Sequence, residues 1–141
     1  MGNVHRYIIV VGCGRLGAYL ASQLSQDGHS VVVIDVNDES FRHLAVGFSG
    51  FHVQGDATEL AVLRQAKAAK ADLVLATTRC DNMNLMVAQL AKEVLGVSHV
   101  IARVFDPARE ASYRRLGVET VCSTVVAGNA FLDKFPQNWR A

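Results

Sequence analysis

The chain has 141 residues, of which 50% are hydrophobic and 19% are charged, a balance that predicts one globular domain spanning residues 1–141. Its net charge of +1 gives no electrostatic case for binding nucleic acid or an anionic membrane surface. No apolar run approaches the roughly 20 residues that a membrane helix needs, so direct membrane insertion is not expected.

Short runs of β-branched residues alternate along the chain with segments of helical periodicity. The first half predicts a strand at 7–11, a helix at 16–27, a strand at 30–35, a helix capped by Asp38 and running to about Phe48, a strand at 51–54 and a brief helix from Thr58 through Ala66. The second half predicts a strand at 73–77, a long helix capped by Asp81 and ending near Leu95, a strand at 99–104, a helix from Pro107 to Gly117, a strand at 119–122 and a last helix from about Val125 to Phe135.

The predicted strands are almost continuously apolar, which is typical of strands with helices on both faces of their sheet. Strict alternation of strand and helix favours right-handed crossovers between parallel strands. We therefore expect an α/β fold: a Rossmann-like, doubly wound, parallel six-stranded sheet with a C-terminal helix.

A glycine-rich motif, GCGRLG at residues 12–17, follows the first strand and opens the first helix. In this context the G-x-G-x-x-G pattern indicates a nucleotide site, because Gly12 permits a tight turn, Gly14 lets a pyrophosphate approach the backbone, and Gly17 allows close packing. The helix N-terminus then offers free N–H groups to phosphate. A glycine-rich turn without a ligand is the alternative. The site prediction includes all six residues: Gly12, Cys13, Gly14, Arg15, Leu16 and Gly17.

Asp35 ends the second strand, where an acidic side chain can accept hydrogen bonds from both hydroxyls of an adenine-side ribose. The same charge would repel a 2′-phosphate, which argues against NADP. The alternative is a helix-capping or turn aspartate. Val36, the next residue, is assigned to the same site.

Later loops on the same predicted sheet edge carry further candidates. Asp56 and Ala57, after the third strand, would lie near an adenine, although Asp56 and Thr58 can equally cap the next helix. Thr77 and Thr78 end the fourth strand, and the polar residues after them are candidate ribose or phosphate contacts: Arg79, Asp81, Asn82 and Asn84. For Asp81 we favour an N-cap.

Two arginines complete the candidate site. Arg15 lies within the phosphate loop, where a guanidinium suits a terminal or second phosphate. A cation is poorly placed at a helix start, which favours a functional role over plain solvent exposure. Arg103, near the end of the fifth strand, is a weaker candidate, because an ion pair with Asp106 explains it equally well.

Taken together, GCGRLG after YIIVV, then SVVVID, GDAT, ATTRCDNMN and VIARVFDP, resemble the RCK or KTN domain, also called the TrkA N-terminal domain. The resemblance implies a cytosolic module of prokaryotic potassium channels and transporters. It implies binding of NAD(H) or of AMP, ADP or ATP, assembly through dimers, and control of potassium flux by shape change. By motif, Gly12, Gly14, Arg15 and Gly17 would take phosphate, Asp35 the ribose, and Asp56 with Ala57 the adenine. Arg103 and Phe105 replace the acidic residues of calcium-gated relatives, so no metal site is expected.

The rival function is an NAD-dependent oxidoreductase, which also needs a substrate pocket and a proton donor. No Tyr-x-x-x-Lys pair occurs, so we expect no enzyme and no catalytic residues. A nucleotide-binding scaffold for another membrane system remains a further alternative. Three widely spaced cysteines, Cys13, Cys80 and Cys122, indicate small buried side chains in a reduced, cytoplasmic protein. We expect the protein to be cytoplasmic and to associate peripherally with the inner membrane through a transporter partner.

The last predicted helix carries more large apolar residues than one helix face on its own domain requires. We expect it to project from the domain and to be covered by the two-fold partner of a homodimer. The alternative is a helix that folds back onto its own sheet.

Overall fold

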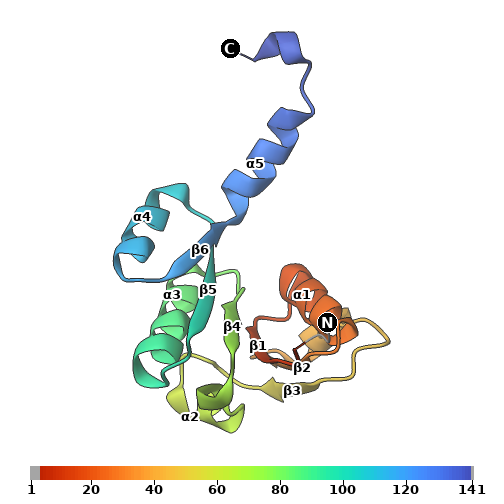
Figure 1. Cartoon of the computed structure of the whole chain (residues 1–141), viewed down its shortest axis with the longest axis vertical. Helices are drawn as coiled ribbons and strands as arrows, with labels where there is room; N and C mark the ends of the chain where they lie inside the picture. Colours follow the sequence, from red (N-terminus) through yellow and green to blue (C-terminus); the bar gives the residue numbers. More distant parts are fainter. Residues whose placement is uncertain (1–3, 141) are drawn as a thin grey trace.

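Six parallel strands form the centre of the computed structural model, which describes residues 4–140 (Figure 1). The strands are β1 (Tyr7–Val11), β2 (Ser30–Asp35), β3 (Phe51–Gln54), β4 (Leu73–Ala76), β5 (His99–Val104) and β6 (Glu119–Cys122). Their order is β3-β2-β1-β4-β5-β6, and every neighbouring pair is parallel. This is the doubly wound, Rossmann-like arrangement that the sequence predicts, and the fold prediction is confirmed.

The main helices are α1 (Arg15–Gln26), α2 (Leu60–Gln65), α3 (Asp81–Gln89), α4 (Pro107–Arg115) and α5 (Ser123–Asp133). Short 3₁₀ segments are η1 (Asp38–His43), η2 (Ala68–Lys70) and η4 (Gln137–Trp139), while η3 (Leu90–Val94) continues α3 as a π-helix. Among residues 4–140, no helix has both the length and the hydropathy required to cross a bilayer.

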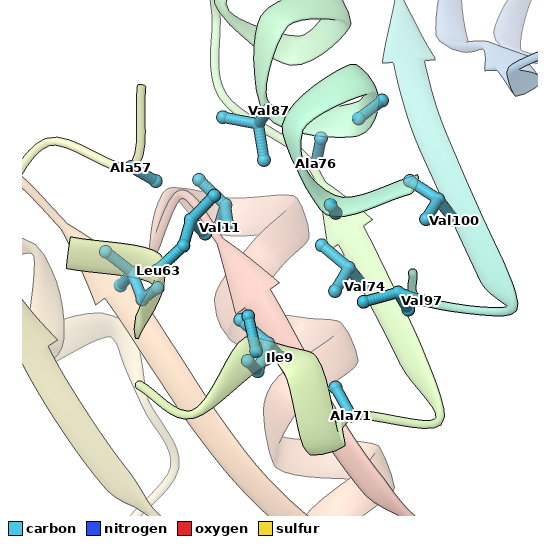
Figure 2. Packing of buried hydrophobic residues seen from close by; sticks show 14 of the residues in the cluster. Ile9, Val11, Ala57, Leu63, Ala71, Val74, Ala76, Val87, Val97 and Val100 are labelled. Carbon is cyan, nitrogen blue, oxygen red and sulfur yellow. The ribbon is translucent and has the colours of Figure 1, made fainter. Parts of the chain in front are cut away.

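Alternate residues of the strands feed two separate cores, one on each face of the sheet. On one face, Ile9 and Val74 pack with Leu63 of α2 and Val87 of α3 (Figure 2). On the other face, strand residues such as Val10 pack against α1. Burial on both faces explains why the strands read as continuous apolar runs.

At three predicted helix starts, the residue expected to cap or open the helix does not do so. Asn37, not Asp38, caps η1 by accepting from Glu39 N at 3.0 Å, and η1 ends at His43 well before Phe48. Thr58 lies in a turn closed by Asp56, so α2 starts only at Leu60. Asp81 is the first residue of α3 rather than its cap, and its carboxylate instead accepts from Phe105 N and Asp106 N of the β5–α4 loop.

Helix α5 extends away from the sheet and lies clear of α1 to α4 (Figure 1). It starts at Ser123, two residues earlier than predicted, and none of its residues is buried. The prediction of a projecting helix is therefore confirmed, and the fold-back alternative is wrong. Its covering by a partner stays a prediction.

Candidate functional site

A cavity of about 910 Å³ lies at the carboxyl edge of the sheet, where open α/β folds bind ligands. Its walls come from the ends of β1, β2, β4 and β5 and from the loops after them. Eleven predicted residues line it: Gly12, Gly14, Arg15, Leu16, Asp35, Val36, Ala57, Thr77, Thr78, Arg79 and Arg103. Other predicted residues are not among its lining residues: Cys13, Gly17, Asp56, Asp81, Asn82 and Asn84.

The three glycines of the loop meet three different steric demands. Gly12 has a φ of +97°, and a Cβ there would lie 2.9 Å from Thr78 N. A Cβ on Gly17 would lie 1.7 Å from the Gly12 carbonyl oxygen, so any side chain at this position would clash with the loop. A Cβ on Gly14 would meet no protein atom within 4 Å, and Gly14 lines the cavity. The loop is thus open at Gly14, where a phosphate can approach.

Asp35 faces the cavity and also braces the glycine loop. Its Oδ2 accepts from Cys13 N at 2.8 Å, and its Oδ1 accepts from Asn37 N at 2.8 Å. Each carboxylate oxygen can accept a second hydrogen bond, so both the turn role and a ribose role fit the same side chain. Burial, and then the charge of Asp35, raise the pKa of the Cys13 thiol to about 11. Cys13 therefore contributes its backbone N–H, and its thiol is a neutral, buried group.

Thr77 and Thr78 line the cavity, but their hydroxyl protons are already bound within the protein. Thr77 Oγ1 donates to the carbonyls of Val11 and Gly12 at 2.9 and 3.2 Å. Thr78 Oγ1 donates to Asn84 Oδ1 at 2.6 Å. Thr77 thus joins the end of β4 to the end of β1, and Thr78 joins the loop after β4 to α3.

Asn84, a candidate ligand contact in the sequence, is fully buried, and its amide bonds within the protein. Its Nδ2 donates to the carbonyls of Thr78 and Arg103, both at 3.0 Å, while its Oδ1 also accepts from Thr78 N at 2.9 Å. One side chain therefore fixes the loop after β4 to the end of β5. Asn82 likewise binds within the protein, accepting from Arg109 at 2.9 Å.

In the loop after β3, Asp56 forms hydrogen bonds within the protein. Asp56 Oδ1 accepts from Thr58 N at 2.9 Å and from Thr58 Oγ1 at 2.7 Å. These bonds, the hydroxyl's first, lower the pKa of the Asp56 carboxyl. Asp56 thus closes a turn before α2 rather than capping the helix, whose N-cap is Glu59, and the neighbours Gly55 and Ala57 line the cavity.

Three arginines line the cavity, while Asp35 is its one acidic lining residue among residues 4–140. Arg103 stacks with its guanidinium carbon 4.1 Å from the centre of the Phe105 ring, and its Nε donates to Ser123 Oγ at 3.4 Å. Arg103 does not form the alternative ion pair with Asp106. The Asp106 carboxylate pairs with Arg109 instead, with 3.8 Å between Asp106 Oδ2 and Arg109 Nε. Burial, followed by the charge of Arg79, lowers the pKa of Arg103.

Sequence reasoning missed the wall formed by Asn37, Ser40 and His43, from η1 and the residue before it. His43 donates from Nδ1 to the Cys13 carbonyl at 3.0 Å and so holds the glycine loop. In this fold the segment after β2 always starts at the carboxyl edge of the sheet, which is a general signal that it can contribute to the site. The sequence predicted an α-helix for this segment, and that prediction did not indicate which of its residues would face the cavity. Cys80 was wrongly expected to be buried, since it is exposed and lines the cavity, and Met83 and Phe105 were also missed.

Residues 8–124 match the family model of the TrkA-N domain. The chain is 42% identical over 117 residues to the Trk system potassium uptake protein TrkA of Streptomyces coelicolor, which covers 83% of this chain and 52% of that protein. It is 34% identical over 110 residues to a TrkA homolog of Pyrococcus abyssi, covering 78% and 48%. The chain therefore spans about half the length of the curated relatives it matches.

Solved structures share the fold at low sequence identity. The TrkA-N domain of the inner membrane protein ybaL from Escherichia coli has a TM-score of 0.82 at 18% identity, over 96% of this chain and 100% of that one. The Kef CTD of Shewanella denitrificans in its AMP-bound form scores 0.75 at 24%, over 86% and 74%. The GsuK channel bound to NAD scores 0.70 at 22%, over 86% and 22%.

Proposed function

This chain belongs to the TrkA-N domain family, and on that premise we propose that it is a regulatory domain that controls potassium transport in response to an adenine nucleotide. The resemblance predicted from the sequence is thereby confirmed. A family of regulatory domains also agrees with the expectation that the chain is not an enzyme. The observation that carries the nucleotide proposal is the cavity, in which the open face of Gly14 lies beside the carboxylate of Asp35.

In the proposed binding mode, the phosphates lie against the backbone of the glycine loop and the N-terminus of α1, with Arg15 beyond them. Asp35 accepts from the ribose hydroxyls with its remaining lone pairs. Adenine lies between Val36 and the loop carrying Gly55 and Ala57. The AMP and NAD held by the Kef and GsuK neighbours agree with this class of ligand.

We propose further that residues 1–141 form one domain that works as a homodimer and associates with a potassium channel or transporter at the membrane. Two apolar surfaces support the dimer. Phe131 and Val126 of α5 are 72% and 58% exposed. On β6, Val121 is 48% exposed; it pairs with Arg103, two residues from Ile101 of the core beneath α1, so it lies on the α1 face of the sheet, at the edge that β6 forms. A two-fold partner would cover both surfaces at once.

A direct route connects the cavity to α5. Arg103, a lining residue, bonds to Ser123 in the first turn of α5. The next residue, Thr124, donates from Oγ1 to the Phe105 carbonyl at 2.6 Å, and Phe105 also lines the cavity. A ligand that moves Arg103 or Phe105 therefore acts on the base of the proposed dimer helix. Regulation requires that the ligand bind one arrangement better than another.

Calorimetric titration of the purified chain with AMP, ADP, ATP, NAD⁺ and NADH tests the nucleotide proposal. We expect saturable binding to wild type and its loss in Gly14→Val, because a Cβ at Gly14 meets no protein atom within 4 Å and the branched side chain extends into the space proposed for the phosphates. Gly47→Val is the matched control, since a Cβ there also meets nothing within 4 Å and Gly47 does not line the cavity. Absence of binding to wild type, or equal binding to Gly14→Val, would contradict the proposal.

A further inference from the structure

The wall that η1 contributes to the cavity follows from its 3₁₀ geometry. A 3₁₀ helix has about three residues per turn, so side chains three positions apart lie one above the other. Ser40 and His43 have this spacing, and both line the cavity. Glu39 and Arg42 form the neighbouring row, which does not line the cavity, and they pair with each other at 3.1 Å. The helix therefore presents one row of side chains to the cavity, and this row ends at His43.

The hydrogen bond of His43 determines which of its ring nitrogens is left for a ligand. Its Nδ1 lies 3.0 Å from the Cys13 carbonyl oxygen. A carbonyl oxygen can only accept, so Nδ1 carries the proton and the Nε2 of the neutral ring is an acceptor. No side chain or backbone group among residues 4–140 bonds to this Nε2. The neutral ring thus offers the cavity an acceptor, and a second proton converts this acceptor into a positively charged donor.

His43 and Asp35 hold the same residue of the glycine loop from two sides. Asp35 Oδ2 accepts from Cys13 N at 2.8 Å, while His43 Nδ1 donates to Cys13 O at 3.0 Å. Both side chains therefore lie at the β2 end of the cavity, beside the space proposed for the ribose. Two acceptors suit the two ribose hydroxyls, which donate. The same acceptors oppose a 2′-phosphate, which is negatively charged and whose oxygens accept.

We propose that His43 is a specificity-determining residue for the ribose, and that its protonation state determines whether the cavity accepts a 2′-phosphate. The proposal rests on the proposed function and specifies the regulation of the same site. With a neutral ring, His43 and Asp35 both present acceptors and select an unmodified ribose. With a protonated ring, Nε2 donates a charge-assisted hydrogen bond to a 2′-phosphate, and its charge offsets that of Asp35. Acidification therefore broadens the range of adenine nucleotides that the site binds.

Charged or titratable side chains lie on four elements next to His43: Asp35 of β2, Arg15 of α1, Asp38, Glu39 and Arg42 of η1 itself, and His52 of β3. Histidine is the one side-chain type among them whose ordinary titration range includes neutral pH. His52 stacks on Phe41 of η1, with 4.3 Å between the ring centres, and does not line the cavity. A change in nucleotide specificity around neutral pH is therefore assigned to His43.

Calorimetric titrations with 5′-AMP and adenosine 2′,5′-bisphosphate, at about pH 8 and about pH 5.5, test the proposal, because these values lie on either side of the ordinary titration midpoint of histidine. We expect wild type to prefer AMP at the higher pH. This preference should fall roughly tenfold or more at the lower pH, the effect of a charge-assisted hydrogen bond. His43→Gln keeps an amide donor for the Cys13 carbonyl but cannot titrate. Its preference should fall less than about threefold, the part due to titration of the phosphate itself.

His43→Lys supplies a permanent charge, so it should weaken the preference for AMP already at the higher pH. The side chain of His43 is exposed, so both variants should keep the fold. His99→Gln is the matched control and should behave as wild type, since His99 is an exposed histidine of β5 that does not line the cavity.

A wild-type preference that is the same at both pH values, an equal fall in His43→Gln, or an undiminished preference in His43→Lys would each overturn the role of His43. All three outcomes leave nucleotide binding in place. Failure of wild type to bind AMP at either pH would instead overturn the proposed function.

Discussion

Asp35 combines two tasks in one carboxylate, since it orders the glycine loop through Cys13 N and faces the cavity with the lone pairs that remain. The charge that suits two ribose hydroxyls also repels a 2′-phosphate. A single residue thus orders the loop and, in the proposed binding mode, also determines the kind of ribose that the cavity accepts.

Asp35→Ala should weaken adenine-nucleotide binding by about 1–3 kcal/mol, the usual cost of losing charge-assisted hydrogen bonds. It should also reduce the discrimination against NADP. Calorimetry with NAD⁺ and NADP measures both effects, with Asp38→Ala as a control, because Asp38 is exposed and does not line the cavity. If wild type binds NADP as tightly as NAD⁺, the assigned role of Asp35 is wrong.

The cysteines provide a test that depends on pH. A pKa of about 11 keeps the Cys13 thiol protonated at neutral pH, and both Cys13 and Cys122 are buried. A thiol reagent at neutral pH should therefore modify one cysteine rapidly, Cys80, and this fast phase should disappear in Cys80→Ser. Saturating nucleotide should slow the same phase, because Cys80 lines the cavity. Rapid modification of Cys13 in the folded protein would contradict the structure.

Residue roles were predictable from the sequence where the backbone alone determines them. Gly12, Gly14 and Gly17 each meet the steric demand that the motif implies. The roles of Asp56, Thr77 and Asn84 were not predictable, because each depends on a hydrogen-bond partner elsewhere in the fold. A polar residue at the carboxyl edge of the sheet can form hydrogen bonds within the protein or with a ligand. The structure, which shows its hydrogen-bond partners, is needed to distinguish these roles.

Among the elements, the first turn of α3 organises the far side of the site. Asp81 and Asn84 lie on this turn, and together they bind the β4–α3 loop, the end of β5 and the β5–α4 loop. In the sequence, Asp81 and Asn84 are candidate ligand contacts. In the structure, their hydrogen bonds position Arg103 and Phe105.

Asn84→Leu should destabilise the protein by at least about 3 kcal/mol, because several buried backbone groups of Thr78 and Arg103 would lose their partner. Chemical denaturation measures the free energy of unfolding. The control is Asn82→Ala, at an exposed position of the same helix, which should cost less than about 1 kcal/mol. Similar losses in the two variants would remove the bracing role of Asn84.

Element prediction was accurate for strands and weaker for helix starts, for a physical reason. The bounds of β1, β2, β3, β5 and β6 agree with those predicted. Burial on both faces gives β1 and β2 nearly unbroken apolar runs, whereas the edge strands β3 and β6 are largely exposed. β4 ends at Ala76, one residue earlier than predicted. Helix starts depend on which acceptor satisfies the first N–H groups, and Asn37 and Asp38 compete as equals in the sequence.

At the scale of the whole molecule, α5 leaves an apolar surface that its own domain does not cover. Phe131→Asp should convert the proposed dimer to a monomer, since it places a charge where two apolar surfaces would meet. The side chain is 72% exposed, so the fold of the domain should persist. Sedimentation equilibrium measures the mass, with Val46→Asp as a control at an exposed loop position. Dimers that survive Phe131→Asp would place the interface elsewhere.

In the proposed mechanism, nucleotide in the cavity changes the arrangement of two chains through Arg103, Ser123 and α5. Small-angle scattering tests this coupling. It is recorded with no nucleotide, with AMP and with ATP, at a concentration where sedimentation shows a dimer. We expect a dimer whose scattering profile differs between AMP and ATP, and we expect the difference to vanish in Gly14→Val. A monomer at micromolar concentrations, or dimer profiles that are the same with every ligand, would contradict it.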